Sequence, residues 1–283
     1  MLTRREVLSV AASIGVTGSA AQSQRKPTLI GLLNPYTTAK NRPFQDTFVR
    51  AMSQHGHVPG RDFLLLERYA EGDNERLPHL AHELVAARVN LIVVSSTNAA
   101  RAAQQATSTI PIVFDAVGDP VRAGFAESVH RPGRNMTGLS NFSGDLTPKR
   151  LELLKQAVPR CRTVAVLANP SNPFYASTLQ RLQPFADKLE LKVFLVSARS
   201  NDDFEDAFHA MKLARADALL ETADAYLWMH GEQIASLALR HGLPSISAFH
   251  DLVEAGWVDE LRSRHACLRP AGCGVRRQDP QRW

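Results

Sequence analysis

The sequence predicts an α/β protein in which two lobes, each a doubly wound parallel sheet, form a clamshell. The segment Leu91–Pro120 holds an apolar run, a polar turn, a short helical run and a second apolar run, which is the order of a βαβ unit. The two apolar runs, Leu91–Val94 and Ile110–Phe114, carry no polar side chain, as expected of strands buried on both faces. The same alternation starts again after residue 141, so we expect a second lobe.

The first lobe is expected over residues 28–140. Its predicted strands are Thr28–Leu33, Phe63–Tyr69, Leu91–Val94, Ile110–Phe114 and Met136–Ser140. Its predicted helices are Pro43–His55, Arg76–Arg88, Ala99–Thr107 and Val121–His130. Polar loops follow these strands, and in open parallel sheets ligands bind at the strands' carboxyl ends.

The second lobe is expected over residues 141–250. Its predicted strands are Thr163–Ala168, Lys192–Ser197, Ala218–Glu221 and Ser245–Ser247, and its predicted helices are Pro148–Val158, Phe174–Leu189, Asp202–Lys212 and His230–His241. Each lobe opens with an apolar strand followed by an Asn-Pro pair, Asn34-Pro35 and Asn169-Pro170. This parallel predicts that the strand ends of the two lobes face each other across a cleft.

The N-terminus has the layout of an export signal. The pair Arg4-Arg5 precedes a weakly apolar run from Val7 to Val16 and a group of small residues that ends at Ala21. Residues 1–21 therefore resemble a twin-arginine signal peptide, which predicts a periplasmic protein. The alternatives are a short membrane anchor or a frayed helix, but about ten weakly apolar residues are too few to span a bilayer.

The composition argues against nucleic-acid binding. Lysine and arginine outnumber aspartate and glutamate by 33 to 28, but most of this excess lies in residues 1–21 and 257–283. The rest of the chain is nearly neutral and lacks the basic patch that nucleic-acid recognition needs. The three cysteines, Cys161, Cys267 and Cys273, have no metal-ligand spacing, so we expect no metal and no cofactor. A monomer is expected.

One continuous segment carries a family resemblance. Residues Ile110–Ser140 read IPIVFDAVGDPVRAGFAESVHRPGRNMTGLS, with an IPIVF strand, a VGDP turn, an RPG turn and an N-x-TG-x-S run in that order. Together with Ala102–Thr109, Pro148–Leu154 and Phe249–Gly256, this segment resembles the substrate-binding proteins of ABC transporters. The resemblance covers about Thr28–Gly256.

The resemblance implies a type I periplasmic-binding-protein fold that closes on a small ligand of the amino-acid or aromatic amino-acid type. It also implies delivery of that ligand to a membrane permease driven by an ATPase. The sequence itself has no GxSxG, HExxH, P-loop or GxGxxG motif, so we expect no enzyme. The alternative is a ligand-sensing module of a signalling system on the same fold.

The candidate ligand-binding residues lie in loops after the predicted strands. Ser96, Thr97 and Asn98 precede a helix, where hydroxyls and free backbone N–H groups suit a carboxylate, although plain capping is equally compatible. Asp224 matches by position an acidic residue of the family and is the expected partner of an ammonium group, or a helix N-cap. The remaining candidates are Asn34, Tyr36, Asp119, Asn169, Asn172, Tyr226 and Phe249. For Asp119, between Gly118 and Pro120, we favour a structural role in the turn.

The C-terminal tail departs from the family pattern. Residues 257–283 show no helical or strand period. Codons can be chosen for them such that reading one base later gives Gly-Trp-Met-Ser-Tyr-Gly and then an apolar-periodic helix of the family kind. The sequence thus predicts a frameshift near Gly256 that replaced the native C-terminus with an aberrant, disordered tail. A truncated and non-functional copy is the corresponding alternative.

Overall fold

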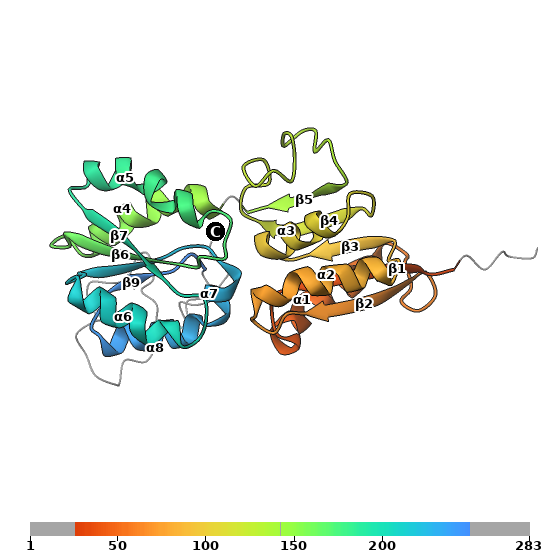
Figure 1. Cartoon of the computed structure of the whole chain (residues 1–283), viewed down its shortest axis with the longest axis horizontal. Coiled ribbons are helices and arrows are strands. Elements are labelled where there is room, and N and C mark those ends of the chain that lie inside the picture. Colours follow the sequence, from red (N-terminus) through yellow and green to blue (C-terminus); the bar gives the residue numbers. More distant parts are fainter. Residues whose placement is uncertain (1–25, 142, 250–283) are drawn as a thin grey trace, which may run out of the picture.

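A computed structural model describes residues 26–141 and 143–249 of the chain. These residues form two α/β lobes that lie side by side (Figure 1). The predicted signal segment, residues 1–21, and the predicted frameshifted tail, residues 257–283, lie outside the described residues. No helix in the described part of the chain has both the length and the apolar character needed to cross a membrane.

The first lobe contains a five-stranded parallel sheet of order β2-β1-β3-β4-β5. Its strands are β1 (Thr28–Asn34), β2 (Phe63–Tyr69), β3 (Leu91–Val94), β4 (Ile112–Val117) and β5 (Met136–Ser140). The central strands β1 and β3 are almost fully buried because helices cover both faces of the sheet. The chain runs outward in both directions from β1, which is the doubly wound arrangement that the sequence predicts.

The helices of this lobe are α1 (Thr38–Gln54), the short 3-10 turn η1 (Asn74–Arg76), α2 (Leu77–Ala86) and α3 (Thr97–Ala106). Helices α2 and α3 contact each other and supply Leu80, Leu84 and Ala103 to the main core. Helix α1 packs Phe44 and Phe48 against a smaller core on the other side of the sheet.

The second lobe repeats this design with a four-stranded parallel sheet of order β7-β6-β8-β9. Its strands are β6 (Thr163–Ala168), β7 (Lys192–Ser197), β8 (Ala218–Glu221) and β9 (Ser245–Ile246). Helices α4 (Thr147–Ala157) and α5 (Thr178–Lys188) share one core, whereas α6 (Asp203–Leu213), α7 (Ala225–Met229) and α8 (Gly231–Arg240) share the other. The 3-10 turns η2 (Ser143–Leu146) and η3 (Tyr175–Ser177) precede α4 and α5.

One predicted helix is wrong. Residues Val121–His130 form turns instead of a helix. The Asp119 carboxylate accepts a hydrogen bond from the Arg122 backbone N–H at 3.0 Å and so starts a single turn. Gly124 then has a φ of +70°, a left-handed conformation that ends the turn.

Three other helix predictions differ from the structure at their N-terminal ends. The helix predicted at Pro43–His55 is α1, which begins five residues earlier, at Thr38. The segment predicted as Phe174–Leu189 begins with the turn η3, and its α-helix starts only at Thr178. The segment predicted as His230–His241 is α8, which is preceded by the separate short helix α7 that Asp224 caps.

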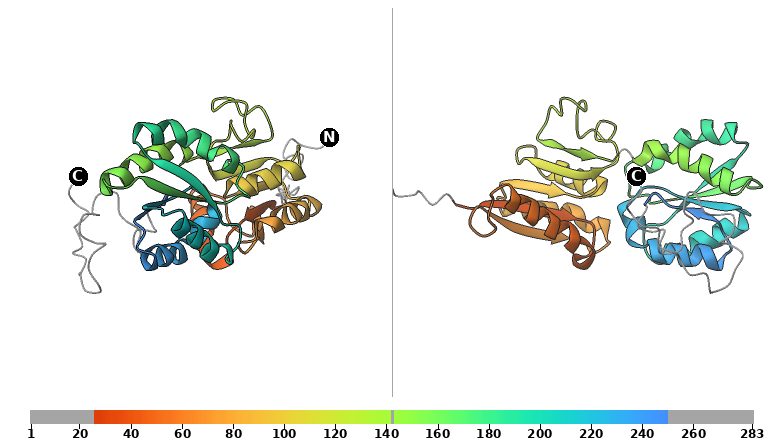
Figure 2. Two further views of the ribbon diagram at one scale, coloured as in Figure 1. Left: turned by 60° about the vertical axis from the view of Figure 1, so that its left-hand side comes forward. Right: turned by 180° about the vertical axis from the view of Figure 1, so that it is seen from behind.

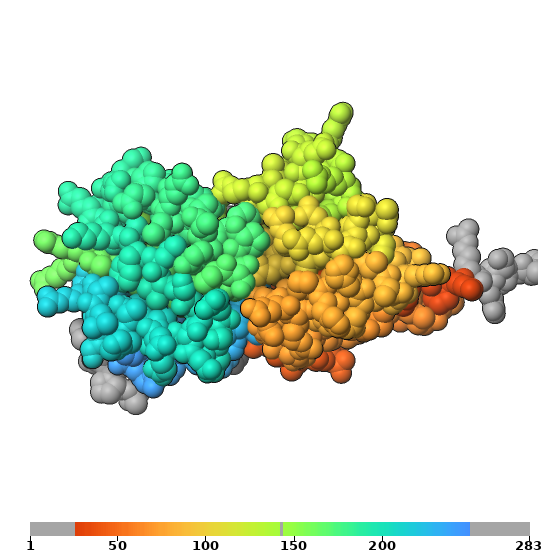
Figure 3. Space-filling view, viewed as in Figure 1, coloured from red at the N-terminus to blue at the C-terminus, as the bar shows by residue number. Residues whose placement is uncertain are grey.

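The two lobes also lie next to each other when the molecule is seen from behind (Figure 2), and their surfaces touch along a seam in the space-filling view (Figure 3). In the first lobe Tyr36 packs edge-to-face on Trp228 of the second, with ring centroids 5.1 Å apart. The Lys40 ammonium donates to the Met229 carbonyl at 2.9 Å and lies over the Trp228 ring. Phe174 of the second lobe packs against the main core of the first. The space enclosed by these contacts is the candidate site.

Candidate functional site

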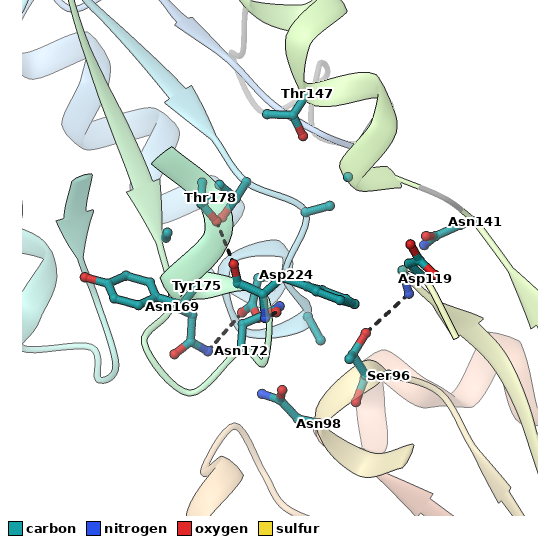
Figure 4. Close-up of a pocket in the computed structure, with 18 of the residues that line it drawn as sticks. Ser96, Asn98, Asp119, Asn141, Thr147, Asn169, Asn172, Tyr175, Thr178 and Asp224 are labelled. Atoms are coloured by element: carbon teal, nitrogen blue, oxygen red, sulfur yellow. Dashed lines mark hydrogen bonds between the residues drawn. The ribbon is translucent and has the colours of Figure 1, made fainter. Parts of the chain in front are cut away.

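A cavity lies between the lobes at the carboxyl ends of their parallel strands (Figure 4). It comprises about 1070 Å³ of space, counting the open solvent at its mouth. The first lobe contributes the loops after β1, β3 and β4, and the second lobe those after β6, β8 and β9. The two lobes present different chemistry to this space.

The wall from the first lobe is built on the N-terminus of α3. Ser96 is the N-cap, 5% exposed, and its hydroxyl oxygen accepts a hydrogen bond from the Ala99 N–H at 3.0 Å. No described residue accepts the Ser96 O–H hydrogen, so the hydroxyl can still donate to a ligand. Helix α3 also directs the positive end of its dipole and its unpaired first N–H groups toward the cavity.

The neighbours of Ser96 complete this wall. The Thr97 hydroxyl accepts a hydrogen bond from the Gly118 N–H at 3.3 Å and thereby ties α3 to the loop after β4. The buried Oδ1 of Asn98 has no hydrogen-bond partner among the described residues. A buried carbonyl oxygen without a hydrogen-bond partner destabilises the fold. This atom is therefore available to accept a hydrogen bond from a ligand at the cavity edge.

The wall from the second lobe centres on Asp224, which is 4% exposed. Its Oδ1 accepts hydrogen bonds from the backbone N–H groups of Tyr226 and Leu227 and from the Asn169 side-chain amide at 3.0 Å. Its Oδ2 accepts one hydrogen bond, from the Asn172 side-chain amide at 2.8 Å. Oδ2 can therefore accept a further donor from a ligand.

The two asparagines hold this carboxylate because each also fixes its own loop. The Asn169 Oδ1 accepts from the Ser171 N–H and the Asn172 Oδ1 accepts from the Phe174 N–H, both at 2.9 Å. These are local side-chain turns of the kind that asparagine favours. Burial raises the pKa of Asp224 above its ordinary value, and the hydrogen bonds from Asn172, Asn169 and the backbone limit this rise. The amide hydrogen bonds thus help keep a buried carboxylate charged.

Apolar and aromatic groups fill the walls between these polar ends. Tyr36 lines the cavity and donates its hydroxyl hydrogen to the Ser95 carbonyl at 3.1 Å. Burial raises the pKa of the Tyr36 phenol, and the nearby Asp115 and Asp224 raise it further, so Tyr36 stays neutral. Phe174 and Phe249 line the second-lobe side.

Nine of the eleven predicted site residues line the cavity: Tyr36, Ser96, Thr97, Asn98, Asp119, Asn169, Asn172, Asp224 and Phe249. Asn34 and Tyr226 do not line it. Asn34 is buried at the end of β1, where its carbonyl accepts from the Ala70 N–H. Tyr226 points into the second-lobe core and stacks on Phe204 with ring centroids 6.0 Å apart.

Asp119 and Asp224 also have the structural roles predicted for them, one in a turn and the other as a helix N-cap. Asp119 accepts from the Arg122 N–H and lies 3.6 Å from the Arg122 guanidinium, so it fixes its turn as favoured from the sequence. Asp224 caps α7 while it lines the cavity. Capping and cavity lining therefore coincide at Asp224, as they do at Ser96.

Sequence reasoning missed a group of cavity residues that belong to helices. Thr147 and Pro148 begin α4, Thr178, Arg181 and Leu182 lie on α5, and all five line the cavity. They follow no strand end, so the loop rule cannot find them. In the described part of the chain, no group of three or more His, Cys, Asp or Glu side chains is placed to hold a metal ion.

A sequence model of the ABC transporter substrate binding protein family matches residues 45–259. The chain belongs to this family. Its members are substrate-binding proteins that act outside the cytoplasm. The two lobes form a clamshell like that of type I periplasmic binding proteins, which confirms the predicted fold class.

Relatives agree with this assignment. The "Tyrosine-binding protein" of Clostridioides difficile strain R20291 is 26% identical over 209 residues, which are 74% of this chain and 60% of the relative. A conserved domain protein from Vibrio cholerae superimposes with a TM-score of 0.74 at 25% identity. The match covers 82% of this chain and 78% of the Vibrio cholerae chain. A Streptococcus pneumoniae protein solved in complex with L-Trp has a TM-score of 0.71 at 21% identity. The match covers 83% of this chain and 80% of that protein, and it shows a shared fold.

Proposed function

We propose that the protein captures a free amino acid with an aromatic side chain and delivers it to the permease of an ABC importer. The observation that carries this proposal is the pairing of opposite chemistry across one cavity. Hydrogen-bond donors at the N-terminus of α3 face a buried carboxylate at Asp224. A free α-amino acid is a zwitterion, whose carboxylate suits the first wall and whose ammonium suits the second.

The carboxylate of the ligand is placed at Ser96. The Ser96 hydroxyl has a hydrogen to donate, and the first-turn N–H groups of α3 add donors and a favourable dipole. Charge-assisted hydrogen bonds of this kind are the stronger class, at about 1.5–3 kcal/mol each.

The ammonium of the ligand is placed at Asp224 Oδ2. This oxygen accepts only one hydrogen bond from the described residues, so it has room for a charged donor. A buried carboxylate gains most from a charged partner because little water competes for it. The aromatic rings of Tyr36, Phe174 and Phe249 then provide apolar surface for the ligand side chain.

The related tyrosine-binding protein supports an aromatic amino acid as the ligand. Export of the protein by the twin-arginine route, delivery to a permease and its ATPase, and a monomeric state belong to the same proposal. The replaced C-terminus is a separate proposal about the gene. Sequencing the coding DNA tests it, because absence of a better-matching frame beyond Trp257 would overturn it.

A thermal-shift panel tests the proposed function. The purified protein is heated with each of the twenty amino acids and with small aromatic carboxylates that lack the amino group. An aromatic amino acid at a hundred times its Kd should stabilise the fold by about 2.7 kcal/mol and raise Tm by several degrees. If no amino acid raises Tm, the proposed function is wrong.

A further inference from the structure

The cavity has a second polar end, away from Ser96 and Asp224. It is formed by the 3-10 turn η2 and by helix α5, at the connection between the lobes. Arg181 and Asp145 face each other there and both line the cavity. Because both ends line one cavity, this second end is a candidate partner for the side chain of a ligand whose amino-acid group occupies the first end.

Arg181 and Asp145 form an ion pair that leaves hydrogen-bonding capacity unused. The Arg181 Nη2 donates to the Asp145 Oδ1 at 2.8 Å. No described residue accepts from Nη1 or Nε of Arg181, and none donates to Oδ2 of Asp145. The pair thus offers both donors and an acceptor at one place.

The setting of the guanidinium keeps these donors near the cavity. The Arg181 side chain is 29% exposed and that of Asp145 is 56% exposed, so the pair is partly open to water. Its Nη1 lies so close to Gly144 that a Cβ on that residue would be 2.9 Å from it. Gly144 therefore gives the guanidinium room beside the cavity that a larger residue would take.

The charge balance of the pair indicates what it would recognise. Because Asp145 neutralises Arg181, the second end carries no net charge and favours neither an anionic nor a cationic side chain. A hydroxyl is the matching group, since it can accept a hydrogen bond from Arg181 and donate its own hydrogen to Asp145. A purely apolar side chain would leave both unmatched.

We propose that Arg181, with Asp145, selects aromatic amino acids that carry a ring hydroxyl over those that do not. The proposal rests on the proposed function and specifies which ligand that site prefers. A site that hydrogen-bonds a ligand hydroxyl discriminates strongly against the analogue that lacks it. Since this pair is partly open to water, the expected preference for L-tyrosine over L-phenylalanine is about tenfold.

Isothermal titration with L-tyrosine and L-phenylalanine tests the proposal on the full chain. Wild type should bind L-tyrosine about tenfold more tightly. Arg181→Met should bind both amino acids with equal affinity, mainly through weaker L-tyrosine binding. Arg240→Met is the matched control, because Arg240 forms a similar ion pair with Glu205 at 2.9 Å on the surface of the same lobe. It should leave both affinities unchanged.

Arg181→Lys is a second test variant, for use if Arg181→Met does not fold. It retains the positive charge next to Asp145 but not the planar set of donors. Its preference should fall between those of wild type and Arg181→Met. Equal affinities in wild type, or an unchanged preference in Arg181→Met, would overturn this proposal and leave the proposed function standing. Failure of wild type to bind either amino acid would overturn both.

Discussion

The two walls of the cavity present different kinds of partner for the charged groups of a ligand. The first-lobe wall uses one continuous stretch, Ser95–Asn98, whose hydroxyls and backbone N–H groups sit at a helix N-terminus. The second-lobe wall uses a full charge, Asp224, held by amides from a loop more than fifty residues earlier in the chain. The first wall is a local motif, and the second exists only after the lobe has folded.

Under the proposed function, this difference couples ligand binding to closure of the two lobes. Neither wall alone pairs both charges of an amino acid, so only the arrangement with both lobes in contact satisfies the ligand. A ligand that binds one arrangement better shifts the population toward it. The cross-lobe contacts at Trp228 add to the same arrangement.

The largest expected effect comes from removing the charge of the second wall. Asp224→Asn keeps the size of the side chain but loses the charge and sets an amide against the donating amides of Asn169 and Asn172. Affinity for the amino acid should fall by about 100-fold, since losing one member of a buried charged pair costs about 3 kcal/mol. Isothermal titration measures it. Equal weakening of a deaminated analogue would show that the fold, not the ammonium contact, is lost.

Removing the hydroxyl of the first wall should have a smaller effect. Ser96→Ala loses the cap on the Ala99 N–H, worth about 1 kcal/mol of stability, and one hydrogen bond to the ligand carboxylate, worth about tenfold in affinity. Thr37→Ala is the matched control, because Thr37 caps α1 through the Lys40 N–H outside the cavity. It should lower Tm without changing affinity. Unchanged affinity in Ser96→Ala would remove Ser96 from the binding wall.

A contact between the lobes but outside the cavity should also affect binding. Trp228 does not line the cavity, yet it holds Tyr36 and Lys40 of the other lobe. Trp228→Ala should weaken ligand binding by about fivefold, because the closed arrangement loses an aromatic pair and a cation–π contact worth about 1 kcal/mol together. Phe185→Ala, which removes a similar contact with Lys188 within one lobe, should not change affinity. Equal effects of the two substitutions would contradict the role of closure.

The last expected effect concerns stability instead of affinity, and it is a difference in pH dependence between the lobes. Burial raises the pKa of Asp115 in the first lobe to about 6 and that of Glu221 in the second to about 8. Because each folded-state pKa lies above its unfolded value, each group's contribution to stability is complete at low pH. It is lost as pH rises through that folded-state pKa.

Urea unfolding of wild type between pH 4 and pH 9 should therefore show stability falling in two ranges. Asp115→Asn should remove the fall below about pH 6, and Glu221→Gln the fall that continues toward about pH 8. If each variant changes stability by the same amount at every pH, neither carboxyl titrates as described.

The local parts of this molecule could be predicted from the sequence. The apolar strand runs were placed to within three residues at their ends, and Ser96 and Asp224 stood out as caps because a small polar residue precedes a helix at each position. The helix predicted at Val121–His130 is wrong because Gly124 within the segment and Pro120 just before it favour turns over a continuous helix.

The parts that depend on packing could not be predicted. Asn34 and Asn169 look alike in sequence, but only Asn169 faces the cavity, whereas Asn34 is enclosed by its own lobe. Tyr226 follows the cap, and the direction of α7 sends its ring into the core. Arg181 lies in mid-helix, and only the folding of η2 against α5 brings it to Asp145.

The central claim is that the cavity binds both charges of a free amino acid at once, one on each lobe. Isothermal titration of wild type with L-tyrosine, tyramine and 3-(4-hydroxyphenyl)propanoate tests it most directly, because the two analogues lack the carboxylate and the ammonium respectively. We predict measurable binding of L-tyrosine and binding of each analogue at least about 100-fold weaker. Binding of either analogue as tight as that of L-tyrosine would contradict the claim.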